Sequence, residues 1–349
     1  MKLLTSILFL ANTIFIVSSL QAKGPSFSLN NPEHKPHRII RTCCSFGTEM
    51  QMFAIPGVKL TEITGFDQIG SHHYLGAPSE ENGIIYSRRG GFIDMGHLRD
   101  QADWTAYLYT QLKENKSKGE MSMVIGREGG EKTLNVNLPA SLTNSDLIQL
   151  AGKIAYDLSV WHEIATWFGA STIPFVPERY SSFSIEDPYS NLLGVTIGIK
   201  AIQSDLPYEE AVTTIIRETL RNLDVVSNKA ETILAMEAVR NIWWTRDKKL
   251  PSSKVLLQRQ LQVYPCLQPW LVPGWKSLNV ETSELKVPEV ASDGEPLNSF
   301  YQLEFNLNYK FPFHKMFPER KERRITQNDF DRLLTQIAAE LKRKESRFR

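Results

Sequence analysis

The amino-acid sequence predicts an α+β fold: a helix-rich single large domain with a small antiparallel sheet. Between residues 94 and 245, apolar residues recur at three- and four-residue steps, which is the period of an amphipathic helix. From Tyr301 to Phe311, apolar and polar residues instead alternate strictly, as in a half-buried strand. Two more strands are expected around a Gly-Gly turn in residues 121–138. The second of these, TLNVNL, also alternates, so we expect it to pair with residues 301–311.

The first 22 residues have the features of a signal peptide. Lys2 gives a positive start, an apolar run follows, and the small residues of SSLQA suit cleavage after Ala22. The apolar run is short for a membrane span, although an uncleaved anchor is the alternative. We therefore expect export, with a periplasmic or secreted location after cleavage near Ala22.

Behind this segment we expect two further parts. Residues 23–40 form an N-terminal leader that contains proline and histidine, and residues 41–349 form the single α+β domain. The 40 Lys and Arg residues nearly balance the 39 Asp and Glu residues, so the charge does not favour nucleic acid as a partner. A cell-envelope component is the partner class that export suggests.

The chain has three cysteines, which are the adjacent Cys43 and Cys44 and the distant Cys266. Neighbouring cysteines bond to each other only with strain, and the CxxC spacing of redox and zinc motifs is absent. In an exported protein we therefore expect a disulfide from Cys43 or Cys44 to Cys266, with one thiol left over.

The stretch SDLIQLAGKIAYDLSVWHEIATWFG, residues 145–169, predicts one long helix that ends in a glycine. Its apolar stripe consists of Leu147, Ala151, Ile154, Leu158 and Ala165. His162 lies on this stripe, and Glu163 follows on its flank near the helix end. An imidazole and a carboxylate turned towards a core need partners, because unpaired buried polar groups are costly. We therefore take His162 and Glu163 as catalytic candidates.

A second helix is expected from about Asp94, after the turn at Gly90-Gly91. Asp94, His97 and Asp100 step by three and can share one side of this helix. Asp94 suits the position of an N-cap, and a metal ligand is its alternative role. His97 lies between the apolar stripe and the acids, so we take it as a catalytic candidate, and Arg99 as a candidate ligand-binding residue.

Two further stretches contain candidate ligand-binding residues. In GSHHYLG, His72 and His73 point to opposite sides of an extended chain, so at most one points inward; we take His73 as the candidate. In SSFSIEDPYSN, Pro188 suits a first helical position, which makes Asp187 the expected N-cap, with ligand binding as its alternative role. The cap leaves Glu186 unexplained, and we also take it as a candidate.

Several spaced motifs resemble those of an uncharacterised bacterial envelope family, domain of unknown function 4056. The motifs are RTCCSFG, GSHHYLG, GGFIDMGHLRDQADWTAYL, DLSVWHEIATWFG and SSFSIEDPYSNLLG. The resemblance runs from about Arg41 to at least Gly194. It implies no established activity, so the functional hypotheses rest on the residues themselves.

The first hypothesis is an exported envelope protein with a His/carboxylate active site, a hydrolase acting on a cell-envelope component. His97, His162 and Asp94 would be ligands of a divalent metal such as zinc, and Glu163 would activate water. The sequence HEIAT has Thr166 where a zincin-type HExxH motif needs its second histidine, so the ligands must come from separate segments. We therefore expect the side chains of His97 and His162 within about 12 Å of each other.

Two alternatives remain open. A metal-free site could use Glu163 and a histidine for acid–base chemistry. A non-catalytic periplasmic binding or scaffold protein could use the same buried His/acid network for structure alone. Three inward-facing polar clusters in one chain favour a site of some kind over a plain core.

Overall fold

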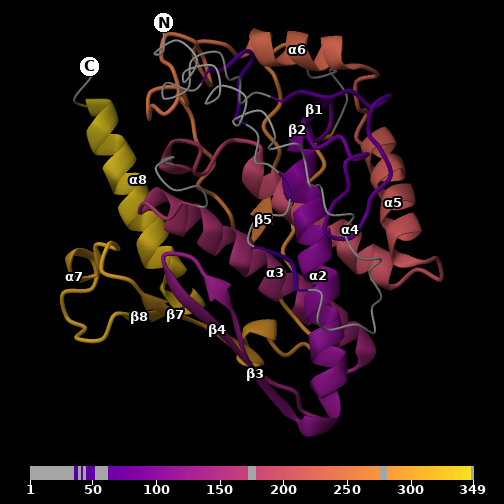
Figure 1. Ribbon diagram of the computed structural model, residues 1–349, viewed down its shortest axis with the longest axis vertical. Coiled ribbons are helices and arrows are strands. Elements are labelled where there is room, and N and C mark those ends of the chain that lie inside the picture. Colours follow the sequence, from indigo (N-terminus) through magenta and orange to yellow (C-terminus); the bar gives the residue numbers. More distant parts are fainter. Residues whose placement is uncertain are drawn as a thin grey trace, which may run out of the picture.

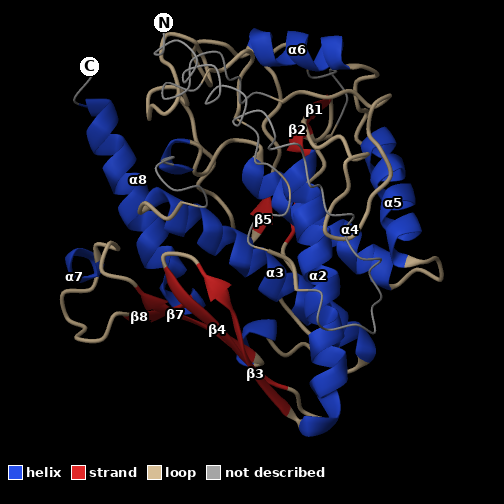
Figure 2. Cartoon of the chain, in the orientation of Figure 1, coloured by secondary structure: helices blue, strands red, loops and turns tan. Residues whose placement is uncertain are grey.

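A computed structural model describes residues 35–37, 41, 45–51, 62–171, 178–275 and 281–346 (Figure 1). Helices and antiparallel sheets are both present in this part of the chain, so the predicted helix-rich α+β class is confirmed (Figure 2). The expected signal peptide, most of the expected leader and the pair Cys43 and Cys44 lie outside the described residues. None of the described helices has the length and apolar character needed to cross a membrane.

Three helices form the centre of the molecule: α2 (Met95–Asn115), α3 (Asn144–Trp167) and α4 (Asp187–Ile202) (Figure 1). The long helix predicted for residues 145–169 is α3, and its N-terminus is fixed by a capping box between Thr143 and Asp146. The predicted apolar stripe is buried, but so are most residues on the other sides of α3. A flank position on this helix therefore does not mean exposure to water.

Two glycines let α2 and α4 approach each other closely. A Cβ atom on Gly194 would lie 2.1 Å from the carbonyl oxygen of Leu98, and one on Gly198 would lie 3.0 Å from that of Ala102. Only a residue without a side chain fits against the backbone at the first position. The contact brings the N-terminal halves of α2 and α4 together.

The largest sheet has the strand order β3-β4-β7-β8 and is antiparallel throughout. Its strands are Glu120–Arg127, Gly130–Asn137, Tyr301–Leu307 and Arg324–Thr326. The predicted pairing of TLNVNL with the alternating stretch is confirmed, with Leu134 opposite Leu303. The last strand residue is Leu307 rather than Phe311, because Tyr309 is exposed in a turn beyond it.

One face of this sheet packs against α3 and α8 (Phe330–Ser346). The Trp161 ring of α3 stacks on Phe305 of β7 at a centroid distance of 4.1 Å and faces Phe330 of α8 at 6.1 Å. The short 3₁₀ helix η4 (Gln327–Asp329) leads directly into α8. This aromatic stack joins the sheet to the central helices.

The remaining elements surround this centre. They are β1 (Ile84–Ser87), β2 (Gly91–Asp94), η1 (Lys116–Lys118), η2 (Glu178–Tyr180), α5 (Tyr208–Asn222), α6 (Lys229–Ala238), β5 (Cys266–Leu267), β6 (Leu285–Lys286), η3 (Leu297–Ser299) and α7 (Phe313–Met316). A second apolar core lies under α6 and contains Trp243 and Trp244. Cys266 is a free thiol, so the expected disulfide to it is not formed in this structure.

The close contact between α2 and α4 predicts the effect of one substitution. Gly194→Ala should lower the free energy of unfolding by about 1–3 kcal/mol, because the new methyl group meets backbone that cannot rotate away. Urea unfolding checks this result, with Lys200→Ala, at an exposed position of the same helix, as the control. A Gly194→Ala protein as stable as the wild type would contradict the close packing.

Candidate functional site

The candidate site lies where the beginnings of α2 and α4 meet the last turns of α3. Asp94 is the N-cap of α2, as one of its two expected roles requires: its Oδ1 accepts hydrogen bonds from the backbone N–H groups of Gly96 (2.7 Å) and His97 (3.0 Å). Its own N–H donates to the Ser190 hydroxyl, which in turn donates to the Glu186 carbonyl. Ser190 thereby fixes the start of α4 against the start of α2.

His97 faces two carboxylates. Its Nδ1 lies 3.3 Å from Asp94 Oδ2 and 3.7 Å from Asp187 Oδ1. The His97 side chain retains 11% of its exposure, whereas those of Asp94 and Asp187 retain 0% and 3%. The imidazole is therefore the accessible member of a group whose acids are shielded from water.

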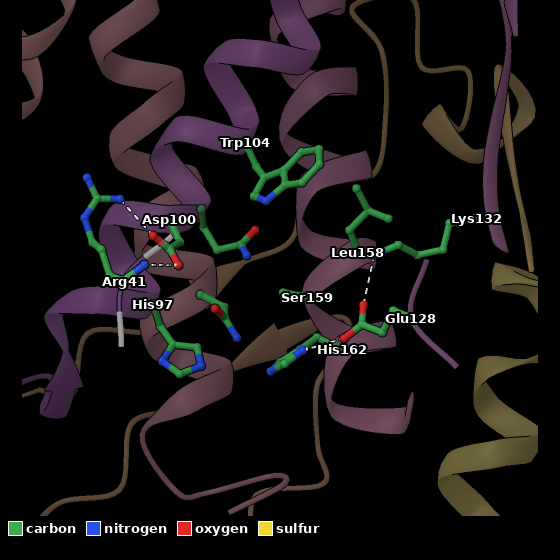
Figure 3. Close-up of a pocket in the computed structure, with 11 residues that line it drawn as sticks. Arg41, His97, Asp100, Trp104, Glu128, Lys132, Leu158, Ser159 and His162 are labelled. Atoms are coloured by element: carbon green, nitrogen blue, oxygen red, sulfur yellow. Dashed lines mark hydrogen bonds and ion pairs between the residues drawn. The ribbon is translucent and has the colours of Figure 1, made fainter. Parts of the chain in front are cut away.

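His162 lies opposite His97. The two ring centroids are 6.5 Å apart, which confirms the predicted convergence of the two histidines (Figure 3). His162 Nδ1 is 2.7 Å from Glu128 Oε1, and the other oxygen of Glu128 accepts from Lys132 Nζ at 2.9 Å. Glu128 lies in the turn between β3 and β4 and Lys132 lies near the start of β4, so the sheet orients a histidine on a central helix.

Glu163 is more deeply buried than its neighbour His162 and holds the segment that leads into α4. Its carboxylate accepts from the Phe183 N–H, and its carbonyl oxygen accepts from the Ser182 hydroxyl at 2.7 Å. Phe183 has φ of 56°, a left-handed conformation that costs a bulky residue about 1–3 kcal/mol. Burial of the Phe183 ring and the bond to Glu163 hold this strained backbone in place.

The predicted N-cap role of Asp187 is wrong. The helix begins at Asp187 itself, and neither Glu186 nor Asp187 caps it with a side chain. Asp187 Oδ1 points towards His97 instead and, among the described residues, has no hydrogen-bond donor. Glu186 accepts the Ser184 hydroxyl at Oε2, while its Oε1 is buried and likewise has no donor in the part of the chain that the structure describes. The alternative role of Asp187, ligand binding, is the one that its geometry suits.

Burial and mutual repulsion change the acid strength of these groups. Burial raises the pKa of Glu186 to about 8, and the nearby charge of Asp94 adds to this effect. Burial also raises the pKa of Asp187 well above its usual range; His97 opposes that rise, whereas Glu186, Glu163 and Asp94 reinforce it. The site thus contains more buried carboxyl groups than its surroundings can keep ionised at neutral pH.

A small cavity of about 40 Å³ adjoins the two histidines. His97 and His162 lie at one end of it and Trp104 at the other, with Glu128 and Lys132 beyond His162 (Figure 3). Gln101 and Asn191 also line it; in the described part of the chain, the side-chain oxygen of each is buried without a donor. The cavity is large enough for a few water molecules or an ion with water.

Two groups of side chains in this site have the spacing of metal ligands. One is His97, His162 and Glu163, and the other is Asp94, His97 and Asp187; within each group the ligand atoms lie within 4.8 Å of one another. His97 belongs to both groups. Through His97, the structure brings together His162, Glu163, Asp94 and Asp187, each of which the sequence had indicated as a candidate.

Two predicted ligand-binding residues lie elsewhere. His73 is half-exposed and pairs with Glu209 at 3.3 Å, so the inward histidine of the pair is His72. Arg99 is fully buried and binds Glu80 at 3.1 Å and the carbonyl oxygens of Gly70 and Ser71. Neither His73 nor Arg99 lines the cavity, because these partners hold both side chains away from it.

Arg99 belongs to a buried ion network beside the site. Arg41 pairs with Glu80 (2.6 Å), Asp100 (2.8 Å) and Asp103 (3.0 Å). His72 lies 3.0 Å from Asp103. Arg41 and Asp100 also line the cavity, so this network forms one of its walls.

Glu128, Lys132, Gln101 and Asn191 are the residues of the site that the sequence analysis missed. Glu128 precedes the Gly129-Gly130 turn, and nothing in the local pattern connects it to a helix 34 residues further along the chain. The only signal was an acid beside a predicted turn, which is usually exposed. Tertiary packing alone reveals the role of Glu128.

Residues 31–273 match the sequence profile of a family described as Protein of unknown function (DUF4056). The match covers more than half of the chain, which therefore belongs to this family. This confirms the family expected from the motifs, while the envelope location stays a prediction. No curated protein and no solved structure is significantly similar to the chain.

The ion network makes stability depend on Glu80. Burial alone would raise the pKa of Glu80, but the hydrogen bond and charge of Arg41, with Arg99 and His72, lower it to about 2. Glu80→Gln should therefore lower the free energy of unfolding by about 3 kcal/mol at neutral pH, because Arg41 and Arg99 lose a buried counter-charge.

The folded-state pKa of Glu80 is depressed, so this stabilisation is present above about pH 4.5 and is lost as the pH falls towards 2. Urea unfolding of wild type and Glu80→Gln at several pH values checks both points, with the exposed neighbour substitution Glu81→Gln as the control. A difference that does not shrink in acid would contradict this account.

Proposed function

We propose that this member of a family of unknown function is a metal-dependent hydrolase of the cell envelope. His97 and His162 would hold a divalent ion such as zinc, and Asp187 and Glu163 would complete the ligand set. The observation that carries the proposal is the convergence of these buried carboxylates on two histidines that line one cavity. Two histidines and one carboxylate, with water in the fourth position, form a known ligand set at catalytic zinc sites.

The residues suit a bound cation because several of their buried side-chain oxygen atoms accept no hydrogen bond from the described residues. In the described part of the chain, four buried oxygen atoms in and beside the cavity have no donor: those of Gln101, Glu186, Asp187 and Asn191. All four are acceptors. A cation, with the water molecules that it carries, satisfies a surplus of buried acceptors and balances the buried negative charge.

The surroundings of both histidines also fit this role. In metal sites, a ligating histidine usually donates its other ring N–H to a carboxylate, which fixes its tautomer and orientation. His97 Nδ1 lies near Asp94, and His162 Nδ1 lies near Glu128, so each ring has such an acid. For His162, the side of the imidazole that carries Nε2 is then the ligand side. At His97, Asp94 and the proposed ligand Asp187 both face Nδ1.

A bound divalent ion supplies Lewis acidity, which polarises a substrate oxygen and lowers the pKa of a coordinated water. The protein's own groups would position the substrate. The oxygens of Gln101 and Asn191 can accept hydrogen bonds from substrate hydroxyl or amide N–H groups, and Trp104 offers an apolar wall. His97 and His162 are the most exposed members of the site, so substrate would approach from their side.

Export belongs to the proposal and rests on the signal-peptide features of residues 1–22. N-terminal sequencing of protein expressed with its full chain in a bacterial host tests it. A mature chain that starts near Lys23 supports export, and an intact Met1 in the cytoplasmic fraction contradicts it.

Metal binding gives the direct test of the site. Purified wild-type protein loaded with zinc and then desalted should retain about one ion per chain, measured by inductively coupled plasma mass spectrometry. His97→Ala and His162→Ala should each lose that ion, whereas His73→Ala, at the half-exposed histidine, should keep it. Retention of zinc by both site variants would refute the metal site.

The role of Glu128 can be tested in the same assay. Glu128→Gln should weaken zinc affinity about 10- to 100-fold, because His162 loses the carboxylate that orients it. Glu131→Gln, on the same hairpin but outside the cavity, is the matched control and should bind as the wild type does. Equal affinities for the two variants would mean that Glu128 does not support a metal ligand.

Hydrolysis is tested separately from metal binding. Isolated cell-envelope material incubated with the zinc-loaded protein should release soluble fragments detected by mass spectrometry, and His162→Ala should release none. Stoichiometric zinc without released fragments would favour the non-catalytic binding or scaffold protein instead. The neighbouring Arg41 network, which buries charge for structural reasons, is the observation that keeps this alternative in view.

A further inference from the structure

We propose that a cationic pocket at the carboxyl-terminal end of α3 binds ligands that carry a phosphate or carboxylate group. This pocket, which we call the α3-end pocket, has a volume of about 340 Å³. Five segments that lie far apart in the sequence form it: the end of α3, the 3₁₀ helix η2, the loop with Ser253 and Arg259, the segment from Lys310 to Lys315 that leads into α7, and the C-terminal part of α8. It shares no lining residue with the cavity between His97 and His162, so the inference does not depend on the proposed hydrolytic function.

The charges that line the α3-end pocket are strongly unequal. Arg179, Arg259, Lys310 and Lys315 face one acid, Glu340. Glu340 is already shared by Lys315 at 3.6 Å, the Trp167 indole N–H at 3.3 Å and a glutamine of its own helix. Among the described residues, the other three cations form no ion pair, although the protein as a whole is nearly neutral. An anionic ligand would supply the missing counter-charge.

Arg259 is the cation of this pocket that hydrogen bonds and an aromatic ring hold in place. Its guanidinium group is partly buried, donates to the carbonyl oxygens of Ser182 and Tyr180, and stacks over the Trp167 ring at 5.5 Å. Burial lowers the pKa of Arg259 to about 10, against the opposing charges of Glu163 and Asp187, so it remains a cation at neutral pH. Carbonyl oxygens orient a guanidinium group but do not neutralise it.

Aromatic faces complete the pocket. Trp167 and Phe168 come from α3, and the Arg179 guanidinium lies 4.9 Å from the centroid of the Tyr180 ring. Guanidinium groups held on aromatic rings present a planar set of donors that matches phosphate and carboxylate geometry. Aromatic rings also pack against the apolar face of a sugar or another ring. An anionic group on a ring-shaped carrier therefore suits both features.

A purely structural explanation of the same cations makes a different prediction. Positive groups near a helix C-terminus interact favourably with the helix dipole and stabilise the fold slightly. That role would make the cations matter for stability and not for ligand binding. Lys310 and Arg179 are exposed and lie on other segments, so substitutions there separate the two roles without threatening the core.

Isothermal titration calorimetry at low ionic strength tests the α3-end pocket with glucose 6-phosphate, glucuronate and neutral glucose. We expect one of the two anions, or both, to bind and glucose not to bind, which also identifies the preferred group. Arg259→Gln and Lys310→Gln should each weaken binding about tenfold or more, because each removes a charged hydrogen-bond donor. Arg179→Gln gives a third variant at an exposed position.

Lys118→Gln, which removes one positive charge far from the pocket, is the matched control and should bind as the wild type does. Equal losses in Lys118→Gln and Lys310→Gln would show general electrostatics and overturn the proposal. So would the absence of anion binding, a lower melting temperature in Lys310→Gln without any change in binding, or binding only to phosphatidylglycerol vesicles and to none of the soluble anions.

Discussion

The cost of burying charge is the constraint on which this structure depends. An isolated charge transferred into a protein interior is strongly unfavourable, and partners must offset that cost. On one side of α2 the chain meets this requirement within itself. Arg41 and Arg99 bind Glu80, Asp100 and Asp103, and the depressed pKa of Glu80 reflects the strength of that pairing.

On the side of α2 that faces α3 and α4, the same requirement is not met by the described side chains. Asp94, Glu163, Glu186 and Asp187 are buried together, and the charge of Arg259 acts on Glu163 and Asp187. Hydrogen bonds from backbone N–H groups satisfy Asp94 and Glu163, whereas Glu186 and Asp187 each keep an oxygen without a donor. The contrast between the two clusters is the physical reason for assigning structure to the first and ligand binding to the second.

Sequence patterns predicted the parts of this arrangement that belong to single elements. The three- and four-residue period showed which side of α3 carries His162, and strict alternation showed that residues 301–307 form a strand. Convergence of His97 with His162 followed because each lies on the inward side of its own helix. These patterns report how one element faces the core, and they are strong where an element is long.

The remaining features depend on which elements meet, and a local pattern does not contain that information. Glu128 reaches His162 only because β4 pairs with β7 and β7 packs on α3. Asp187 was assigned to capping because an acid before Pro188 usually caps, but the approach of His97 offers its carboxylate another partner. Arg99 and His73 lie outside the cavity because each has a partner elsewhere, Arg99 in Glu80 and His73 in Glu209.

The way the site is held also bears on the role of Glu163. One oxygen of its carboxylate accepts the N–H of the strained Phe183, and this bond fixes the segment that delivers Glu186 and Asp187. A group that swings to collect and release protons would loosen that segment in every cycle. Glu163 is therefore better suited to hold its place, as a ligand and anchor, than to act as a mobile base. In the proposed hydrolase, where His97 and His162 hold the ion, proton transfer would then fall to water in the cavity, whereas the sequence alone had suggested Glu163.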